Sequence, residues 1–509
     1  MRRNGFVGIV AVLLAAGCGG NMMTVENVDC DVVIVGGGAG GLHTAFRLGA
    51  TLGKGVCLVE KEPQLGGRIR DIALDGALGG PGVGTGARRV METQDVLFAL
   101  ATELGLKLET PPGAVDLIEA RSKFAFAKDD FVPLYPNLPD PDPMTDRESA
   151  LYDLLRKGPE RKNAAQYGDF RDYIRKVAGF DGYEFLRDMS RFRADFEYPL
   201  DARGYLDYLD EEWDVCCTAS YPQGGMSSFI RGMEAKATAS GVRIFKSSQV
   251  SEIRKDGAGY QVTAGTRAFK APKLVIGISP YWLNQVQGDV AERIRQQAQF
   301  KQLVGVRVVT ITQFWTDAWW TQVKNAGLMK DNLVWRAWTT DHCVNFVEIP
   351  QEPWAAALKV TRSVYDDDIR CVQLWEELIA QGPEKVEAEI QRGLSFLFNK
   401  NGVSTPMMLT IPSPVKTYAK VWPDAWHWLG AGATFTNAQI FKWAAEPLPG
   451  EQVALVGEAY NPQRSGWSDA AYKSSINLLN TRYGLNLPGL KQMLRGWPSV
   501  RQSRSDGGH

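Results

Sequence analysis

Glycines spaced as G-x-G-x-x-G stand at Gly36, Gly38 and Gly41, between two segments of different pattern. An apolar run over 31–35 is typical of a buried parallel strand, and apolar residues at helical spacing follow over 42–52. In such a turn the first glycine permits the bend, the second lets a phosphate approach the backbone, and the third allows close helix packing. A helix start also favours an anion. The predicted chemistry is pyrophosphate binding by Gly36, Gly38, Ala39, Gly40 and Gly41.

A second apolar run over 55–59 ends in Glu60, which stands 19 residues after Gly41 and is followed by Lys61. Both residues are predicted cofactor contacts. An acidic side chain at the end of this strand is placed to accept hydrogen bonds from a ribose diol. The strand, glycine turn, helix, strand and acid together predict a dinucleotide-binding unit. The same acid disfavours a ligand with a 2′-phosphate.

The residues after Glu60 carry a resemblance to a known family. The stretch 65–70 (LGGRIR) comes next, and Gly86-Ala87-Arg88-Arg89 follows it. This arrangement resembles the flavin-containing amine oxidase superfamily, which includes monoamine oxidases and L-amino-acid oxidases. The resemblance implies FAD as the cofactor, with Gly67 and Arg68 against its pyrophosphate and with Gly86, Ala87 and Arg88 as further cofactor contacts. A simple turn is the alternative for the glycine pair.

The resemblance extends over most of the chain in two later segments. In the middle, a helix start at 221–227 and strands at 250–253, 259–264 and 274–278 match the family, which implies that the Val250 backbone meets the adenine. Near the C-terminus, a strand at 452–456 leads into Gly457-Glu458-Ala459-Tyr460 and then Gly466-Trp467-Ser468. The family pattern implies that Glu458 binds the ribityl chain. It also implies that Gly457, Trp467, Ser468 and Ala470 border the flavin.

The expected fold is α/β, with an α+β substrate domain. The resemblance implies a Rossmann-like FAD-binding domain of the glutathione-reductase type, built from three discontinuous segments. A mixed-sheet substrate domain and a helical insertion accompany it. The predicted parts are a signal peptide (1–18), a tether (19–28), FAD-domain segments (29–114, 219–299 and 426–485), a helical region (115–218), a substrate domain (300–425) and a C-terminal tail (486–509).

Four residues are candidates for catalysis. In L-amino-acid oxidases an arginine at the position of Arg89 grips the substrate carboxylate, and a planar guanidinium suits that task. Its alternative partners are FAD phosphate or a structural acid. Arg307 matches a strand position where the family usually carries a lysine that holds water near the flavin; an exposed edge-strand arginine is the alternative. Trp467 and Tyr460 are expected to form an aromatic wall beside the flavin. The alternative for Trp467 is a packed position in the protein core.

The total composition excludes some classes of function. The 57 lysines and arginines nearly balance the 58 aspartates and glutamates, for a net charge of −1, so no nucleic-acid partner is expected. No C-x-x-C or H-E-x-x-H pattern occurs, and no metal site is predicted. A lone His427 between two tryptophans is more often a structural group than a ligand. The oligomeric state stays open, with a homodimer as one candidate.

The first residues look like an export signal. Arg2 and Arg3 precede an apolar run over 5–16, which is too short to span a membrane. The run ends in 14–18 (LAAGC), which resembles a bacterial lipobox and implies lipidation of Cys18. A plain secretory signal and a twin-arginine signal are the alternatives. The predicted product is an exported lipoprotein, anchored to a membrane through Cys18.

The seven cysteines cannot all pair within one chain. Cys18 as a lipid site leaves six. Cys216 and Cys217 are adjacent and would need strained geometry to bridge each other. Whether Cys30, Cys57, Cys343 and Cys371 pair is left open by the sequence.

Three functions fit these observations. The first is oxidative deamination of an L-amino acid or a related primary amine, by hydride transfer to flavin N5, with O2 reduced to H2O2. The second is a flavin-dependent desaturase, isomerase or dehydrogenase acting on a hydrophobic substrate. The third is a non-oxidase FAD protein of electron transfer or assembly. Arg89 and the aromatic wall favour the first.

Overall fold

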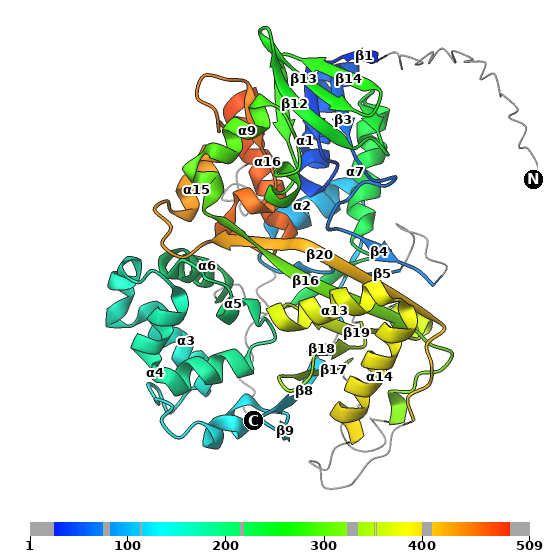
Figure 1. Cartoon of the computed structure of the whole chain (residues 1–509). Coiled ribbons are helices and arrows are strands. Elements are labelled where there is room, and N and C mark those ends of the chain that lie inside the picture. Colours follow the sequence, from blue (N-terminus) through cyan, green and yellow to red (C-terminus); the bar gives the residue numbers. More distant parts are fainter. Residues whose placement is uncertain are drawn as a thin grey trace, which may run out of the picture.

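The fold combines parallel and antiparallel sheets with many helices (Figure 1). The computed structural model describes residues 25–74, 82–111, 114–213, 218–322, 334–350, 352, 354–399 and 410–488. Cys18, Cys216 and Cys217 lie outside the described residues, and so do the signal peptide and most of the C-terminal tail. The expectations for those segments therefore stay predictions.

A parallel sheet forms the centre of the upper body in Figure 1. Its order, among the described residues, is β11 (Arg243–Phe245), β3 (Val56–Val59), β2 (Val32–Val35), β15 (Lys273–Ile276) and β21 (Val453–Leu455). Every neighbouring pair in it is parallel. The strands come from three widely separated parts of the chain. The residues of β2 and β3 are all buried, as expected for a parallel sheet covered on both faces.

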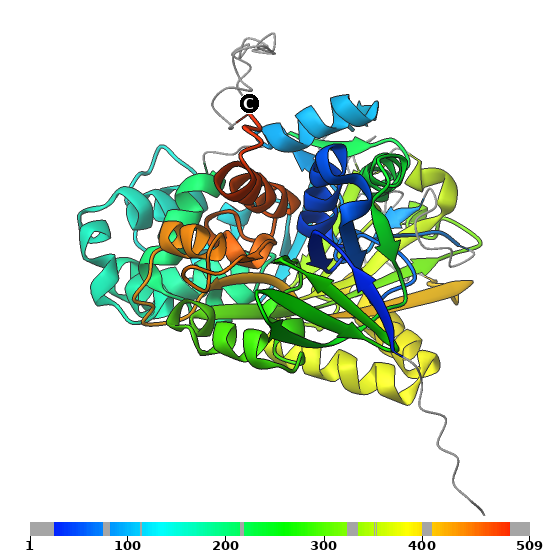
Figure 2. The ribbon, with the colours of Figure 1, turned by 90° about the horizontal axis from the view of Figure 1, so that it is seen from above.

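Helices cover one face of this sheet. They are α1 (Ala39–Leu52), α2 (Asp95–Leu104), α7 (Ser227–Ala239) and α16 (Ser468–Tyr483), and Figure 2 shows α1 beside α16. Their apolar side chains pack on Val32, Ile34 and Leu58. Helix α1, which is predicted to bind the pyrophosphate, thus begins at Ala39 and not at residue 42. The glycines of its first turn have no apolar side chains, so the apolar spacing did not include them.

A smaller sheet covers the opposite face. Its order is β1 (Glu26–Asp29), β14 (Arg267–Ala271), β13 (Gly259–Ala264) and β12 (Val250–Asp256). Strand β1 pairs in parallel with β14, and Val28 is buried in the core beneath it. Residues 26–28 therefore belong to a sheet, and the tether expected over 19–28 is shorter than the sequence suggested.

A long mixed sheet forms the lower body. Its order, within the described ranges, is β20 (Lys416–Leu429), β16 (Leu303–Phe314), β19 (Val360–Asp366), β18 (Phe346–Glu348), β17 (Val334–Thr339), β8 (Ala114–Ala120) and β9 (Lys123–Ala125). Strands β16 and β20 form a long antiparallel pair, whereas β17 and β8 are parallel. Helices α13 (Ile369–Gln381) and α14 (Pro383–Asn399) pack on one face.

A helical region packs against the end of β16 and β20. It holds α3 (Arg147–Lys157), α4 (Phe170–Met189), α5 (Ala194–Glu197) and α6 (Ala202–Trp213). Its core includes Val308, Trp422 and Trp426 of the two long strands. The remaining elements are β4 (Asp71–Ile72), β5 (Val83–Gly84), β6 (Val90–Met91), β7 (Leu108–Glu109), β10 (Ala219–Pro222), α8 (Pro280–Leu283), α9 (Asp289–Gln296), α10 (Ala298–Lys301), α12 (Ala355–Leu358), α15 (Asn437–Ala444) and the short 3-10 helices η1 (Gly53–Gly55), η2 (Lys128–Leu134), η3 (Pro159–Gln166), η4 (Glu458–Tyr460) and η5 (Pro462–Arg464).

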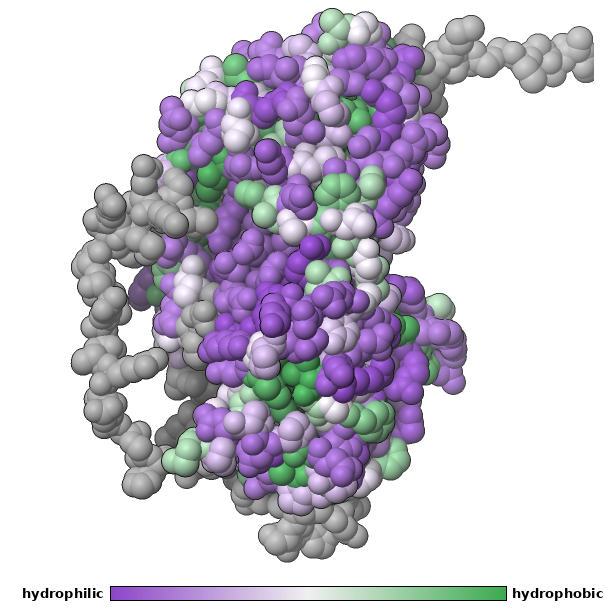
Figure 3. Space-filling model, turned by 90° about the vertical axis from the view of Figure 1, so that its left-hand side faces the viewer, coloured by the Kyte–Doolittle hydropathy of each residue, from purple (hydrophilic) through white to green (hydrophobic). Residues whose placement is uncertain are grey.

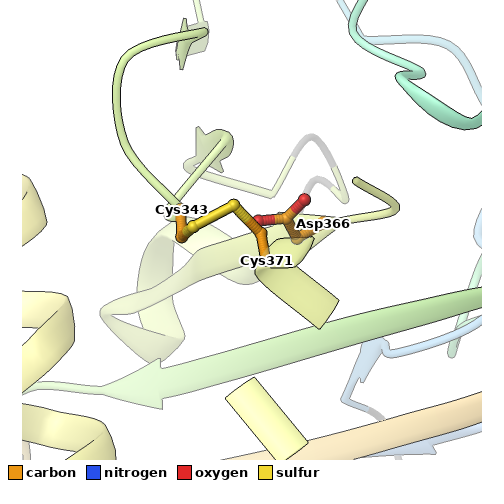
Figure 4. Close-up of side chains that lie close together, drawn as sticks. All are labelled: Cys343, Asp366 and Cys371. Carbon is orange, nitrogen blue, oxygen red and sulfur yellow. A yellow bond between two sulfur atoms is a disulfide. The ribbon is translucent and has the colours of Figure 1, made fainter. Parts of the chain in front are cut away.

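Two disulfides join cysteines whose pairing the sequence left open. Cys30 and Cys57 are bonded between the start of β2 and strand β3. Cys343 and Cys371 are bonded beside the buried carboxylate of Asp366 (Figure 4). Two sulfurs and a carboxylate in such proximity are typical of a metal site, but sulfurs bonded to each other are not available as thiolate ligands.

The Cys30–Cys57 bridge is expected to stabilise the fold. Because it closes 27 residues of sequence, a Cys30→Ala, Cys57→Ala double variant should lose about 3 to 4 kcal/mol of unfolding free energy. Urea unfolding of the oxidised variant and of the wild type, with and without reductant, measures this difference. Identical urea midpoints for oxidised and reduced wild type would contradict the expectation.

The outer surface is mostly polar on the face seen in Figure 3, where hydrophobic residues form small separate patches. Among the described residues, no helix is both long and apolar enough to cross a membrane.

Candidate functional site

A cavity of about 500 Å³ lies where the two bodies meet. Each strand of the parallel sheet sends the loop at its carboxyl end into the lining. In strand order these loops contain Val250, Lys61, Gly38, Ile278 and Glu458. The carboxyl edge of a parallel sheet is where open α/β sheets bind ligands. The opposite wall comes from β16, β19 and β20 of the mixed sheet.

The glycine loop after β2 has the shape of a phosphate cradle. Gly36 has a φ of +96°, which glycine adopts without strain. A Cβ at Gly41 would stand 2.0 Å from the carbonyl oxygen of Gly36, whereas a Cβ at Gly38 would meet no atom within 4 Å. The backbone at Gly38 therefore borders open space at the start of α1, and that space fits a pyrophosphate.

Glu60 stands at the end of β3, as the sequence predicted. Its carboxylate accepts hydrogen bonds from the backbone N–H of Gly37, at 2.7 Å, and of Glu62, at 2.8 Å. Burial raises the pKa of this carboxyl, and the two backbone hydrogen bonds oppose that rise. Two carboxylate lone pairs remain for a ribose diol. The neighbouring Lys61 lies over the Trp282 ring, with its nitrogen 3.0 Å from the ring centroid.

A buried ionic network lies on the cavity wall around Glu458. Its carboxylate accepts from Arg68 Nη1 at 2.7 Å and lies 3.0 Å from His427 Nδ1. His427 Nε2 lies 3.2 Å from Asp424, so two carboxylates hold the same imidazole. The backbone N–H groups of His427 and Gly466 also donate to Glu458, at 3.0 and 3.1 Å.

This network keeps its members charged. Burial alone would raise the pKa of Glu458, but Arg68 and His427 lower it to about 2. Burial alone would lower the pKa of His427, yet Glu458 and Asp424 raise it above its ordinary value. With five donors around it, counting the Ser465 hydroxyl at 3.3 Å, Glu458 has its lone pairs occupied. The sequence anticipated neither Asp424 nor this use of Glu458.

The two adjacent arginines point to different partners. Arg88 forms an ion pair with the buried Glu348, which Arg362 also contacts at 2.7 Å. Neither Arg88 nor Arg89 is among the residues that line the cavity. The partner of Arg88 is a structural acid, which is one of the alternatives considered for these two arginines. Arg89 makes no hydrogen bond or ion pair with any residue that the structure describes. Its guanidinium carbon lies 5.7 Å from the centroid of the Trp467 ring, which is part of the cavity wall.

Arg307 is not brought to the cavity. Its side chain is 51% exposed and forms an ion pair with Glu376 of α13. Because side chains alternate along a strand, Val308 and Thr310 face the cavity instead. The β16–β20 register also shifts between Val306 and Val308. The expectation that Arg307 takes the place of the family lysine is corrected accordingly. The alternative of an exposed arginine describes its side chain, although β16 lies between β20 and β19 and is not an edge strand.

Only one of the two residues expected to form the aromatic wall borders the cavity. Trp467 lines the cavity, but Tyr460 is fully buried in the core and donates its hydroxyl to the carbonyl of Ile278 at 3.0 Å. The sequence missed Trp422 as a wall residue. Its indole N–H donates to the Thr310 hydroxyl at 3.1 Å, which fixes the ring in place. Tyr365, Trp426 and Trp282 are further aromatic residues of the lining.

Most of the expected cofactor contacts border one cavity. These are Gly36, Gly38, Ala39, Gly40, Glu60, Lys61, Gly67, Arg68, Gly86, Ala87, Val250, Gly457, Glu458, Trp467 and Ser468. Gly41 and Ala470 lie behind the wall: Gly41 packs on Gly36, and Ala471 takes the lining position next to Ala470.

Comparison with known proteins identifies the family. The family model described as flavin containing amine oxidoreductase matches residues 39–477, which is most of the chain. The chain belongs to this family. Its cofactor is FAD, and membership of this family makes the protein an FAD-dependent oxidoreductase of the amine oxidase type. None of the curated proteins matches this chain.

Solved structures share the fold. Wild-type putrescine oxidase bound to putrescine matches with a TM-score of 0.61 and 17% identity, over 89% of this chain and 98% of the other. A double mutant of putrescine oxidase matches with a TM-score of 0.60 and 16% identity, over 89% of this chain and 99% of the other. At such identities the likeness shows the fold alone.

The residues present fit FAD. The open space at Gly38 and the start of α1 suit the pyrophosphate, and the spare lone pairs of Glu60 suit a ribose. FAD, when bound, supplies the acceptor for two electrons from a substrate carbon. The described side chains provide an aromatic wall and a set of buried arginines beside it.

Proposed function

We propose that the protein oxidatively deaminates an L-amino acid or a related amine that carries a carboxylate, with O2 reduced to H2O2. The observation that carries this proposal is Arg89, whose guanidinium lies beside Trp467 and makes no hydrogen bond or ion pair with the described residues. A half-buried cation that makes no ion pair is poorly solvated, and a ligand that supplies a negative charge stabilises it. A carboxylate matches the guanidinium in shape and charge.

The charges around Arg89 argue against a diamine. Putrescine is doubly positive at neutral pH, and it is the ligand named for a protein of this fold. Here Arg88, Arg89 and Arg362 surround the single carboxylate of Glu348. A second positive group entering this space would be repelled. An amine with an attached carboxylate avoids that repulsion.

The cavity wall supports positioning of such a substrate. Trp422, Trp426, Tyr365 and Trp467 present flat, water-excluding surfaces. With the carboxylate held at Arg89, the carbon that bears the amine would be directed along these rings. The protein therefore contributes orientation and exclusion of water, while the redox chemistry belongs to FAD.

The domain organisation is part of the same proposal. The segments 29–114, 219–299 and 426–485 would form an FAD-binding domain of the glutathione-reductase type, and the parallel pairing of β2, β3, β11, β15 and β21 supports it. The segments 115–218 and 300–425 would supply the substrate side.

Export as a lipoprotein is the proposed localisation. Two disulfides support it, because such bonds persist mainly in oxidising compartments. Growth of the native host with labelled palmitate tests the anchor directly. Label is expected on the wild type and not on Cys18→Ser, and equal labelling of the two would overturn the proposal.

The activity is tested with purified yellow protein and a panel of amino acids and amines. Peroxide release with amino acids, and little with the corresponding amines that lack a carboxylate, is the expected result. Turnover of simple amines alone would overturn the amino-acid proposal.

An Arg89→Met variant is expected to lose recognition of the carboxylate. A charged hydrogen bond contributes about 2 kcal/mol, so kcat/KM for an amino acid should fall by about 30-fold. Turnover of an amine without a carboxylate should change by less than about threefold, because that amine never used the interaction. Arg89→Lys keeps the charge but not the planar guanidinium, so its kcat/KM for an amino acid should lie between those of the wild type and Arg89→Met. An unchanged KM for amino acids in Arg89→Met would remove the proposed clamp.

A further inference from the structure

Two more arginines lie near Arg89 and come from other parts of the chain. Arg191 follows the end of α4, and Arg336 lies on β17. The charge of Arg336 acts on Arg89, and the charges of Arg336 and Arg89 both act on Arg191. Burial is the main cause that lowers the pKa of both Arg89 and Arg191. Three like charges are thus gathered in a poorly solvated region.

The acids nearby do not balance these charges. Glu348 is already shared by Arg88 and Arg362. Asp116 lies 2.6 Å from Arg336 Nε, whereas its distance to Arg191 is 3.9 Å, too long for a hydrogen bond. Glu148, which also acts on Arg191, is paired with Lys128.

One further acid does not change this balance. Glu352 accepts from the backbone N–H of Gly84 at 3.3 Å and acts on Arg88 and Arg362. Within the described residues, the positive charges of this group therefore exceed its carboxylates.

Arg191 does not itself line the cavity but lies behind two of its aromatic wall residues. Its guanidinium carbon lies 5.8 Å from the centroid of the Phe346 ring, and Phe346 packs edge-on against Tyr365 of the cavity lining. Its neighbour Phe192 packs edge-on against Trp426, another lining residue. The Arg191 side chain is 29% exposed, so it is largely but not fully covered by protein.

We propose that the substrate carries a second acidic group, which Arg191 binds while Arg89 holds the α-carboxylate. The substrate class is then an acidic amino acid, and Arg191 is a specificity-determining residue. Asp116, which pairs with Arg336 at 2.6 Å, is the acid beside Arg191 at 3.9 Å. This inference rests on the proposed amino-acid oxidation.

The first test is a binding measurement on the FAD-loaded wild type. Glutarate and succinate are titrated against butyrate, with the visible absorbance of the flavin as the readout. At least a tenfold lower Kd for a dicarboxylate is the expected result, because two guanidiniums then meet two carboxylates. Equal Kd values for dicarboxylates and butyrate would mean that both arginines serve one carboxylate, and would overturn the inference.

The second test uses Arg191→Met and a matched control, Arg254→Met, which changes an exposed arginine of β12. Arg191→Met should lower kcat/KM at least 30-fold for L-glutamate or L-aspartate, the preferred one of the two. Its effect on a neutral amino acid should stay within threefold. Arg254→Met should change neither. A uniform loss for acidic and neutral substrates in Arg191→Met would assign it a structural role.

The two levels of the proposal fail in different ways. If no amino acid is oxidised by the yellow wild type, the proposed function fails, whatever the dicarboxylate titration gives. If neutral amino acids are oxidised as efficiently as acidic ones, only the second carboxylate site fails. Should Arg191→Met not fold, the wild-type ratio of dicarboxylate to butyrate affinity decides the question alone.

Discussion

A Gly38→Val variant is expected to lose FAD binding while its apoprotein stays folded. The Cβ position at Gly38 has no neighbour within 4 Å, and the residue has an ordinary φ of −70°. A valine is therefore tolerated by the protein but occupies the space intended for the pyrophosphate. The affinity for FAD should fall by at least about 100-fold, as expected when a close backbone approach is blocked.

Titration of the apoprotein with FAD, followed by flavin fluorescence, measures this loss. The thermal midpoint of the apoprotein should stay close to that of the wild type. Gly41→Val is the contrasting variant, because its Cβ would stand 2.0 Å from the Gly36 carbonyl oxygen and should prevent folding instead. Wild-type FAD affinity in Gly38→Val would place the pyrophosphate elsewhere.

A Glu458→Gln variant is expected to lose about 3 kcal/mol or more of unfolding free energy. The substitution keeps the shape of the side chain but removes the charge that Arg68 and His427 share. Asp424 would then be left to balance both cations in a buried site. Removal of one partner from a buried ionic group typically destabilises by about 3 to 5 kcal/mol. Urea unfolding of the apoprotein at constant pH measures the effect.

The pH dependence of stability gives the same network a second test. Glu458 has its pKa lowered to about 2 from 4.5, so its contribution is complete above 4.5 and is lost as the pH falls toward 2. His427 has a pKa raised above 6.5, so its contribution is complete below 6.5 and is lost as the pH rises through the raised value.

The fall in unfolding free energy at acid pH distinguishes the Glu458 network from general charge effects. In Glu458→Gln the loss of stability between pH 4.5 and pH 2 should become shallower than in the wild type. The matched control is Glu376→Gln, whose partner Arg307 is half exposed, and it should change stability by less than about 1 kcal/mol. If the unfolding free energy of Glu458→Gln fell as steeply between pH 4.5 and pH 2 as that of the wild type, the lowered pKa of Glu458 would be contradicted.

Local sequence determined the cofactor half of this protein. The roles predicted for Gly36, Gly38 and Gly41 agree with the local geometry, because the turn, the open space at Gly38 and the helix packing involve residues within a single strand–turn–helix unit. Glu60 is predictable for the same reason, since it ends the next strand. The spacing of residues 31–60 is enough to specify this unit wherever it is placed.

The orientation of single side chains was less predictable. Arg307 was matched to a strand position, but a shift of one residue reverses the face that a side chain occupies. The register of β16 against β20 shifts between Val306 and Val308, which affects the face that Arg307 occupies. This register depends on β20, which lies more than a hundred residues away in the sequence. Tyr460 was matched to a cavity position, but its hydroxyl finds the carbonyl of Ile278 inside the core.

Contacts between distant residues were decided only by the tertiary structure. Arg68 meets Glu458 and His427 lies between two carboxylates because β20 crosses the edge of the parallel sheet. Arg88 takes Glu348 as its partner, which leaves Arg89 without one among the described residues. Sequence determines residue type and local spacing. Which charges meet depends on long-range strand pairing, because an ion pair needs its two partners within about 4 Å whatever their separation along the chain.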